Sequence, residues 1–117
     1  MKLYGIPNCN TVKKAREWLV ANHIAYEFHD FKKLGLDVTT LESWLNQKPW
    51  EKLINRAGMT WRNLTDAEKA KVTDNISAAS LMREKTSVIK RPILEKDGKI
   101  LSLGFDETTF RKLFPDE

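Results

Sequence analysis

Cys9 has the clearest chemical potential in this sequence, because it is the only cysteine among the 117 residues. An apolar extended run over 2–6 precedes it, and apolar residues at helical spacing follow it. This order predicts that Cys9 lies at a helix N-terminus, where unpaired N–H groups and the helix dipole favour a negative charge. Lys13 and Lys14 oppose that dipole, but beside a thiolate they would lower the pKa of the thiol. A reactive thiolate is therefore predicted; the alternative is a cysteine that serves as a small buried hydrophobe.

The elements around Cys9 form a strand–helix–strand unit. The sequence pattern predicts a strand over 2–6, a helix over 10–21, a half-buried strand over 24–31 and a loop over 32–37. A crossover of this length favours parallel pairing of the two strands. Cys9 is thus expected between the first strand and the crossover helix.

The central part of the chain, from about 36 to 86, is predicted to be mostly helical. Thr39 and Glu42 have the spacing of a capping box, and so do Thr65 and Glu68. The pattern also predicts a helix that ends at Lys48-Pro49, a helical turn over 49–54, a loop over 55–62, and helices over 66–72 and 75–84, the second capped by Asp74. No strand pattern interrupts this region, so we interpret it as a helical insertion.

The last part of the chain predicts a hairpin and a closing helix. Apolar runs over 93–96 and 99–103 flank Asp97-Gly98, a dipeptide typical of tight hairpin turns. Asp106 can cap a final amphipathic helix. The order β-α-β, helical block, β-β-α predicts an α/β fold of the thioredoxin type, with a four-stranded mixed sheet, in a single domain over 1–117.

The composition is that of a globular protein and excludes several other classes. With 41% hydrophobic and 31% charged residues, extensive disorder is not expected, and no segment approaches the roughly 20 apolar residues that cross a bilayer. The net charge of +4 is spread along the chain, so a solvated basic surface explains it better than nucleic-acid binding. His23 and His29 lack metal-ligand spacing. With one cysteine and no signal-peptide pattern, we expect a cytoplasmic protein that binds no membrane.

Three segments of the chain resemble the arsenate-reductase-like (ArsC/Spx) family. They are residues 7–15, residues 55–62 and residues 89–94. The similarity covers essentially the whole chain and points within the family to the small bacterial reductases of the YffB-like subgroup. It implies that Cys9 is the catalytic nucleophile and that Pro92 matches the cis-proline that faces the active cysteine in thioredoxin-like folds. The anion-binding residues that it implies are Arg56, Arg91, Lys13, Asn8 and Thr11; for Arg56 an ordinary loop arginine is the alternative.

Three positions depart from the patterns of that family. Its arsenate reductases carry a histidine where Gly5 stands and a further arginine where Gly104 stands. Both differences weaken an arsenate function, because an oxyanion favours several bidentate donors. The family's regulators often use a Cys-x-x-Cys pair, but the fourth position here is Val12. Cys9 therefore has no resolving cysteine in this chain.

These features together predict a monothiol reductase, a thiol-dependent oxidoreductase without a bound cofactor. Cys9 would attack an oxidised substrate, and an external thiol would complete the cycle. Glutathione or another small thiol is the expected co-substrate, glutaredoxin is a candidate protein partner, and the protein is expected to be a monomer. Two alternatives remain open: arsenate reduction coupled to glutathione and glutaredoxin, and a non-catalytic regulator that binds RNA polymerase as the family's regulators do.

Overall fold

The computed structural model describes residues 1–115 and divides the chain into two compact units. The first, here called the sheet unit, contains Met1–Leu34 and the segment Arg91–Glu117, of which the structure describes residues up to Pro115. The second, here called the helical unit, contains Gly35–Lys90. The helical unit covers the region where the sequence predicts an insertion over about 36–86. The single domain over 1–117 stays a prediction, and its last two residues lie outside the described ones.

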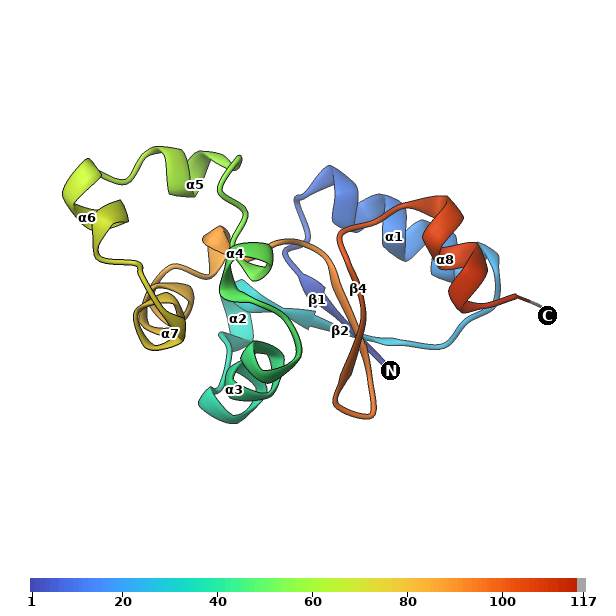
Figure 1. Cartoon of the computed structure of the whole chain (residues 1–117). Coiled ribbons are helices and arrows are strands. Elements are labelled where there is room, and N and C mark those ends of the chain that lie inside the picture. The colour runs from blue at the N-terminus through green and yellow to red at the C-terminus, as the bar shows by residue number, and fades with distance from the viewer. Residues whose placement is uncertain (116–117) are drawn as a thin grey trace. The chain divides into compact units, whose positions relative to one another are not determined.

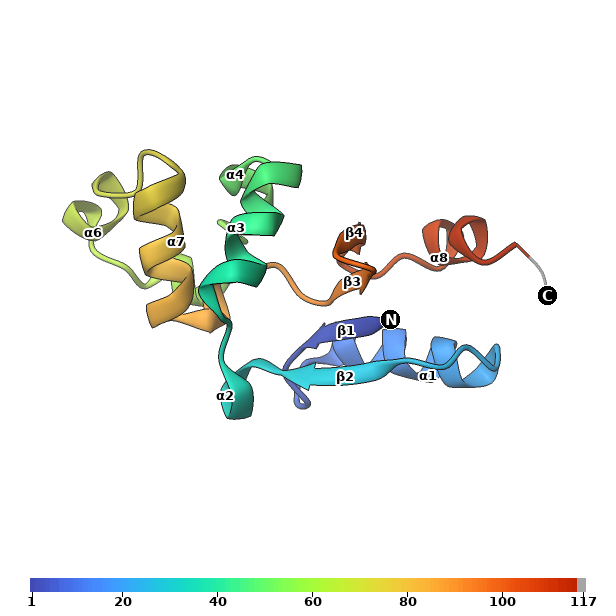
Figure 2. The same cartoon turned by 90° about the horizontal axis from the view of Figure 1, so that it is seen from below.

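The sheet unit is built on a four-stranded mixed sheet (Figure 1, Figure 2). Its strands are β1 (Lys2–Gly5), β2 (Glu27–Asp30), β3 (Ile93–Lys96) and β4 (Lys99–Leu103). They lie in the order β2-β1-β3-β4, and β1 pairs in parallel with β2 and antiparallel with β3, which pairs antiparallel with β4. The predicted thioredoxin-type α/β arrangement is confirmed, including the parallel pairing across the first crossover.

The hairpin between β3 and β4 has the predicted turn. Asp97 has φ 51° and Gly98 has φ 79°, so both adopt the left-handed conformation that two-residue hairpin turns require. A Cβ atom on Gly98 would meet nothing within 4 Å. Glycine is therefore favoured at this turn by backbone conformation and not by lack of space.

Two helices, α1 (Asn10–Ala21) and α8 (Glu107–Leu113), pack against the same face of the sheet. Trp18 of α1 meets Phe110 of α8 edge-on, with 5.5 Å between the ring centroids. Asp106 caps α8 as predicted, since its Oδ2 accepts the Thr109 N–H at 3.0 Å. The fully buried core residues from the sheet and the two helices are Leu3, Ala15, Leu19, Leu94 and Phe110. This core holds the helix that begins directly after Cys9.

The segment around β2 differs from the sequence prediction. The strand predicted over 24–31 is confined to β2, although three apolar side chains of this segment pack against the core. The predicted loop over 32–37 is wrong at its start, because Phe31–Leu34 forms the helix α2. Asp30 supplies the physical reason: its Oδ1 accepts the Lys32 N–H at 2.8 Å and turns the chain directly out of the strand.

The helical unit contains five α-helices and one 3₁₀ helix among its described residues. They are α3 (Val38–Gln47), α4 (Trp50–Leu53), α5 (Met59–Arg62), α6 (Asp66–Ala70), α7 (Asn75–Glu84) and η1 (Thr86–Val88). Two predicted caps are confirmed: Thr65 and Glu68 form a capping box on α6, and Asp74 caps α7 by accepting the Ser77 N–H at 2.8 Å. Helix α3 packs against α7.

The start of α3 differs from the sequence prediction. The capping box of Thr39 and Glu42 is wrong, because Asp37 is the N-cap and its Oδ1 accepts the Thr40 N–H at 2.7 Å. A carboxylate is both a strong N-cap acceptor and a negative charge at the positive end of the helix dipole. Helix α3 therefore begins at Val38, two residues earlier than it would with Thr39 as its N-cap. The predicted end is confirmed, since α3 stops before Lys48.

Two short helices also differ from the prediction. Helix α5 lies inside the predicted loop over 55–62, where Gly58 is the N-cap and its carbonyl accepts the Arg62 N–H at 3.1 Å. A helix of one turn carries too few residues to show an apolar period, so the sequence pattern could not reveal it. Pro49 precedes α4 as its N-cap and does not occupy the first helical position.

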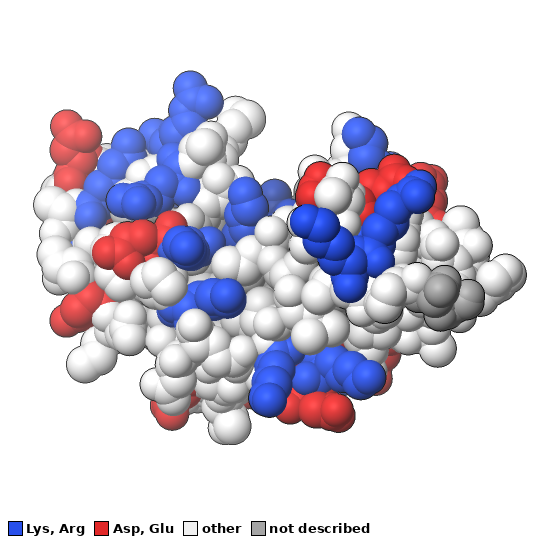
Figure 3. Space-filling view, turned by 45° about the vertical axis from the view of Figure 1, so that its right-hand side comes forward, with Lys and Arg blue, Asp and Glu red and all other residues white. Residues whose placement is uncertain are grey.

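On the face shown in Figure 3, lysine and arginine side chains lie interspersed with aspartate and glutamate. Among residues 1–115, no helix combines the length and the apolar character needed to span a bilayer.

Candidate active site around Cys9

Cys9 is the N-cap residue of α1, between the end of β1 and the first helical turn. Its backbone is extended (φ −101°, ψ 124°), and its carbonyl accepts the Lys13 N–H at 2.9 Å. Its own N–H lies 3.4 Å from the Ile6 carbonyl oxygen, which closes a tight turn out of the strand. The thiol is free and partly buried. The predicted location at a helix N-terminus is confirmed.

Arg91 approaches the Cys9 sulfur from a distant part of the sequence. Strand β3 runs antiparallel beside β1, with Ile93 paired to Tyr4. Because of this register, the start of β3 lies beside the end of β1. Arg91, two residues before Ile93, is thereby brought to the turn that carries Cys9.

Pro92 follows Arg91 through a cis peptide bond, as the family resemblance implies. Pro92 is buried, and its carbonyl accepts the Gly104 N–H at 2.7 Å. Gly104 has φ 83°, a conformation that glycine adopts without strain. The Gly104 backbone therefore fixes the Pro92 carbonyl at the start of β3.

The groups around its sulfur lower the pKa of Cys9 below its ordinary value. Partial burial is the largest single effect and by itself raises the pKa, because it disfavours the thiolate. Hydrogen bonding from the Val12 N–H, the Arg91 side chain and the Thr11 N–H acts in the opposite direction, and the positive charge of Arg91 adds to it. Among the described residues, the sulfur closes no N-cap hydrogen bond of standard geometry.

The cation that acts on the thiol differs from the sequence prediction, which assigned this role to Lys13 or Lys14. Both lysines are exposed on α1, and the largest charge effect on Cys9 comes from Arg91. A lysine on an exposed helix surface keeps its ammonium group in water. Arg91 instead lies on a backbone segment that the sheet fixes beside the sulfur. Within the helix, Thr11 contributes through its N–H.

The anion-binding roles assigned to Asn8, Thr11 and Lys13 stay predictions. All three residues are exposed and lie in the turn or first helical turn around Cys9. The structure thus places their backbone in the turn and first helical turn that adjoin Cys9.

Arg56 belongs to the helical unit. Its guanidinium carbon lies 5.7 Å from the ring centroid of Trp50, a cation–π arrangement. The backbone before it is held by the Asn55 N–H, which donates to the Val88 carbonyl at 2.8 Å. The Arg56 side chain is exposed. Its predicted role at an anion site stays a prediction.

Sequence reasoning missed the contribution of Val12. The Val12 N–H has the largest of the effects that lower the pKa of Cys9, whereas the sequence marked Val12 only as an apolar helix position without a second thiol. The signal was present, because an N-cap side chain normally accepts the N–H two or three residues later. A thiolate at the N-cap could have been assigned the Thr11 and Val12 N–H groups from spacing alone.

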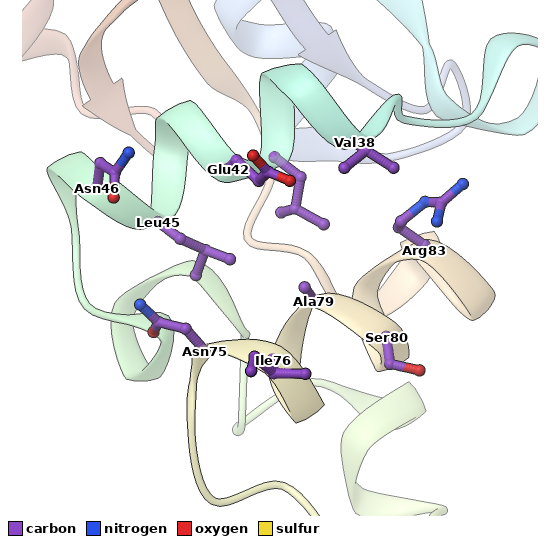
Figure 4. A pocket seen from close by; sticks show the side chains of 10 residues that line it. Val38, Glu42, Leu45, Asn46, Asn75, Ile76, Ala79, Ser80 and Arg83 are labelled. Atoms are coloured by element: carbon purple, nitrogen blue, oxygen red, sulfur yellow. The ribbon is translucent and has the colours of Figure 1, made fainter.

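A groove of about 540 Å³ lies within the helical unit between α3 and α7 (Figure 4). Its walls mix apolar side chains such as Leu45 and Ile76 with charged ones such as Glu42 and Arg83. None of the candidate site residues lines it. Over residues 1–115, no group of three or more His, Cys, Asp or Glu side chains could hold a metal ion.

Comparison with known proteins places the chain among relatives of two kinds. The structure of the YFFB protein is 43% identical, covers 95% of this chain and 96% of that chain, and has a TM-score of 0.87. An arsenate reductase (ArsC) related protein from Brucella melitensis is 47% identical, covers 95% of this chain and 91% of that chain, and has a TM-score of 0.77. The global transcriptional regulator Spx of Streptococcus agalactiae is 30% identical over 97% of this chain and 82% of that protein.

The family assignment rests on the length of the match as well as on these similarities. The model of the ArsC family matches residues 4–113, which include the end of β1, the other three strands, and Cys9, Arg91 and Pro92. The fold agrees with this match, since the similar solved structures cover almost the whole chain. This chain therefore belongs to the ArsC family.

Proposed function

We propose that this protein is a cytoplasmic monothiol reductase that uses the Cys9 thiolate and an external thiol, glutathione. The observation that carries this proposal is the lowered pKa of Cys9, produced by Val12, Arg91 and Thr11 against the opposing effect of burial. A thiolate at neutral pH is the nucleophile that thiol–disulfide exchange requires. The ArsC family and the arsenate reductase related neighbour support thiol chemistry in general.

For a substrate held in a mixed disulfide with glutathione, the proposed reaction has two exchange steps. The Cys9 thiolate attacks the glutathione sulfur, the substrate–glutathione S–S bond breaks, and the substrate leaves as a thiolate that takes a proton from solvent. Cys9 then carries glutathione in a disulfide. A second glutathione thiolate attacks the glutathione sulfur of this adduct, so oxidised glutathione forms and Cys9 returns as a thiolate. The electron pair supplied by the second glutathione thus reduces the substrate sulfur.

Arg91 has two roles in this proposal. Its charge stabilises the Cys9 thiolate before attack and again when Cys9 becomes the leaving group. Its guanidinium can also pair with a glutathione carboxylate, because arginine matches the geometry of a carboxylate with two parallel donors. The anion-binding roles that the family resemblance implies for Asn8, Thr11, Lys13 and Arg56 are part of the proposal.

The test is mass spectrometry of the protein after incubation with oxidised glutathione at pH 7. We expect a single glutathione adduct, located at Cys9 and removed by added reduced glutathione. The Cys9→Ser variant is the matched control and should gain no mass. Complete absence of an adduct on the wild-type chain would exclude the proposed mechanism.

A second candidate function is arsenate reduction, which the similarity to the Brucella melitensis protein favours. Gly5 and Gly104 stand where related arsenate reductases carry donors, which favours general thiol reduction over this activity. A turnover assay with arsenate, glutathione and glutaredoxin separates the two. Turnover that depends on arsenate and on Cys9 would make arsenate the substrate.

A third candidate is a non-catalytic regulator that binds RNA polymerase, which the similarity to Spx favours. The lowered pKa of Cys9 argues for chemistry, because a binding surface has no need of a thiolate. Comparison of cells that produce the wild-type chain or Cys9→Ser distinguishes the classes. A cellular effect that Cys9→Ser leaves intact would favour binding over catalysis.

A further inference from the structure

Gly5, the last residue of β1, is in direct contact with Val12 of α1. A Cβ atom on Gly5 would lie 2.7 Å from the Val12 Cγ2 and 3.2 Å from its Cγ1. Real Cβ atoms essentially never approach another atom to 2.7 Å. Any side chain at position 5 would therefore require Val12 to move.

The reason for glycine at this position is space and not backbone conformation. The glycines with positive φ in the described chain are Gly35, Gly98 and Gly104, and Gly5 is not among them. Gly5 is an ordinary strand residue, paired with Asp30 of β2. Its backbone would accept any residue, so only the closeness of Val12 opposes a larger side chain there.

Val12 has little freedom to move away by itself. It is fully buried, and a β-branched side chain in a helix strongly prefers one χ1 rotamer. Both of its γ carbons lie close to Gly5, so a rotation that moves one of them does not clear the space. A side chain at position 5 would instead displace the first turn of α1.

The residue that packs on Gly5 is also the third residue of α1 after the N-cap Cys9, and its N–H has the largest of the effects that lower the pKa of that thiol. The side chain and the N–H of Val12 belong to one rigid helical turn, so the depth at which the side chain packs sets the position of the N–H. We propose that Gly5 is a positioning residue for Cys9: its missing side chain lets Val12 pack against the end of β1, and this packing aims the Val12 N–H at the thiol. The inference rests on the proposed function only in taking Cys9 as the reacting group.

The test measures the pH dependence of Cys9 alkylation by iodoacetamide in three variants, Gly5→Ala, Val12→Ala and the double variant. In Gly5→Ala we expect the midpoint of the pH profile to move upward and the rate at pH 7 to fall at least about threefold, since fewer molecules carry the thiolate. The double variant lacks the two Cγ atoms that the new Cβ would approach most closely, and the Cβ of residue 12 lies at an ordinary 3.5 Å. The midpoint of the pH profile in the double variant should therefore equal the midpoint in Val12→Ala.

Leu19→Val is the matched control for a purely structural effect. Leu19 is fully buried on the same helix but lies far from Cys9, so this variant should lower Tm without moving the midpoint. An unchanged midpoint in folded Gly5→Ala would overturn the proposal. If Gly5→Ala does not fold, the double variant decides: a midpoint equal to that of Val12→Ala supports the proposal, and a higher one contradicts it.

The outcome of this alkylation test does not depend on whether the proposed function is correct. Iodoacetamide reports only the state of the Cys9 thiol and needs neither glutathione nor substrate. A missing glutathione adduct with a shifted midpoint would remove the proposed reaction and keep the role of Gly5. A glutathione adduct at Cys9 together with an unshifted midpoint would keep the proposed reaction and remove the role of Gly5.

Discussion

In the sheet unit the residues that meet come from opposite ends of the chain, whereas in the helical unit the helix caps join residues three positions apart. Cys9 and Arg91 flank the whole helical unit in sequence, and the pairing of β1 with β3 brings them together. Thr65 and Glu68, in contrast, close their hydrogen bonds within one helical turn. Each unit therefore depends on interactions of a different range.

This contrast teaches where the chemistry of the chain is sensitive to change. The environment of Cys9 combines N–H groups of α1 with a side chain next to β3, so it exists only when the sheet is formed. The caps of the helical unit need only their own turn and stabilise it locally. Substitutions in the sheet unit should change stability and thiol reactivity, and those at the caps should change stability alone.

The largest effect is expected from the core of the sheet unit. Leu94→Ala removes a fully buried side chain that packs with both α1 and α8. We expect the free energy of unfolding, measured by urea denaturation, to fall by about 2–5 kcal/mol because of the lost burial and the remaining cavity. Val20→Ala on the exposed side of α1 is the control and should stay within about 0.5 kcal/mol. Equal losses in the two variants would contradict the assigned core.

The next effect concerns the cation beside Cys9. Arg91→Met keeps much of the side-chain volume but removes the charge and the donors, so the pKa of Cys9 should rise. We expect alkylation at pH 7 to slow by about tenfold, the change produced by loss of a neighbouring cation. Lys13→Met should change the rate less, because the largest charge effect comes from Arg91. The opposite order would return the activating role to the lysine.

The lowered pKa of Cys9 also sets the sign of a pH dependence of stability. Because this pKa is lower in the folded than in the unfolded chain, the thiolate favours folding at pH values above the ordinary thiol pKa of about 8.5. The contribution is lost as the pH falls through the folded-state pKa. The difference in free energy of unfolding between wild type and Cys9→Ser should therefore grow toward alkaline pH, as measured by urea denaturation. A difference that shrinks in that direction would contradict the lowered pKa.

The smallest effect is expected at the caps of the helical unit. Thr65→Ala removes one half of the capping box of α6, which should cost about 1 kcal/mol in the free energy of unfolding. The alkylation rate of Cys9 should not change. Thr39→Ala is the matched control, since the sequence predicts a cap at Thr39 but Asp37 provides it. A larger loss at Thr39 than at Thr65 would show that the caps are assigned wrongly.

Local spacing predicted the features that depend on neighbouring residues. The N-terminal position of Cys9 and the caps at Thr65, Asp74 and Asp106 follow from a side chain and an N–H group within one turn. The turn at Asp97-Gly98 follows from the preference of both residues for a left-handed backbone. The wrong predictions also arose from neighbouring residues. At the start of α3, for example, Asp37 and not Thr39 takes the N-cap position.

By itself the sequence determined that the single thiol lies at a helix N-terminus between a strand and a crossover helix, because that arrangement is encoded over a few adjacent residues. Spacing along the helix is enough to assign the Thr11 and Val12 N–H groups to the thiol, but only the tertiary structure decided which charged side chain acts on it. Arg91 reaches it because β3 pairs with β1, and the Val12 side chain lies against Gly5 where the helix meets the strand. Steric contact and charge act through space, so residues far apart in the sequence determine the reactivity of Cys9.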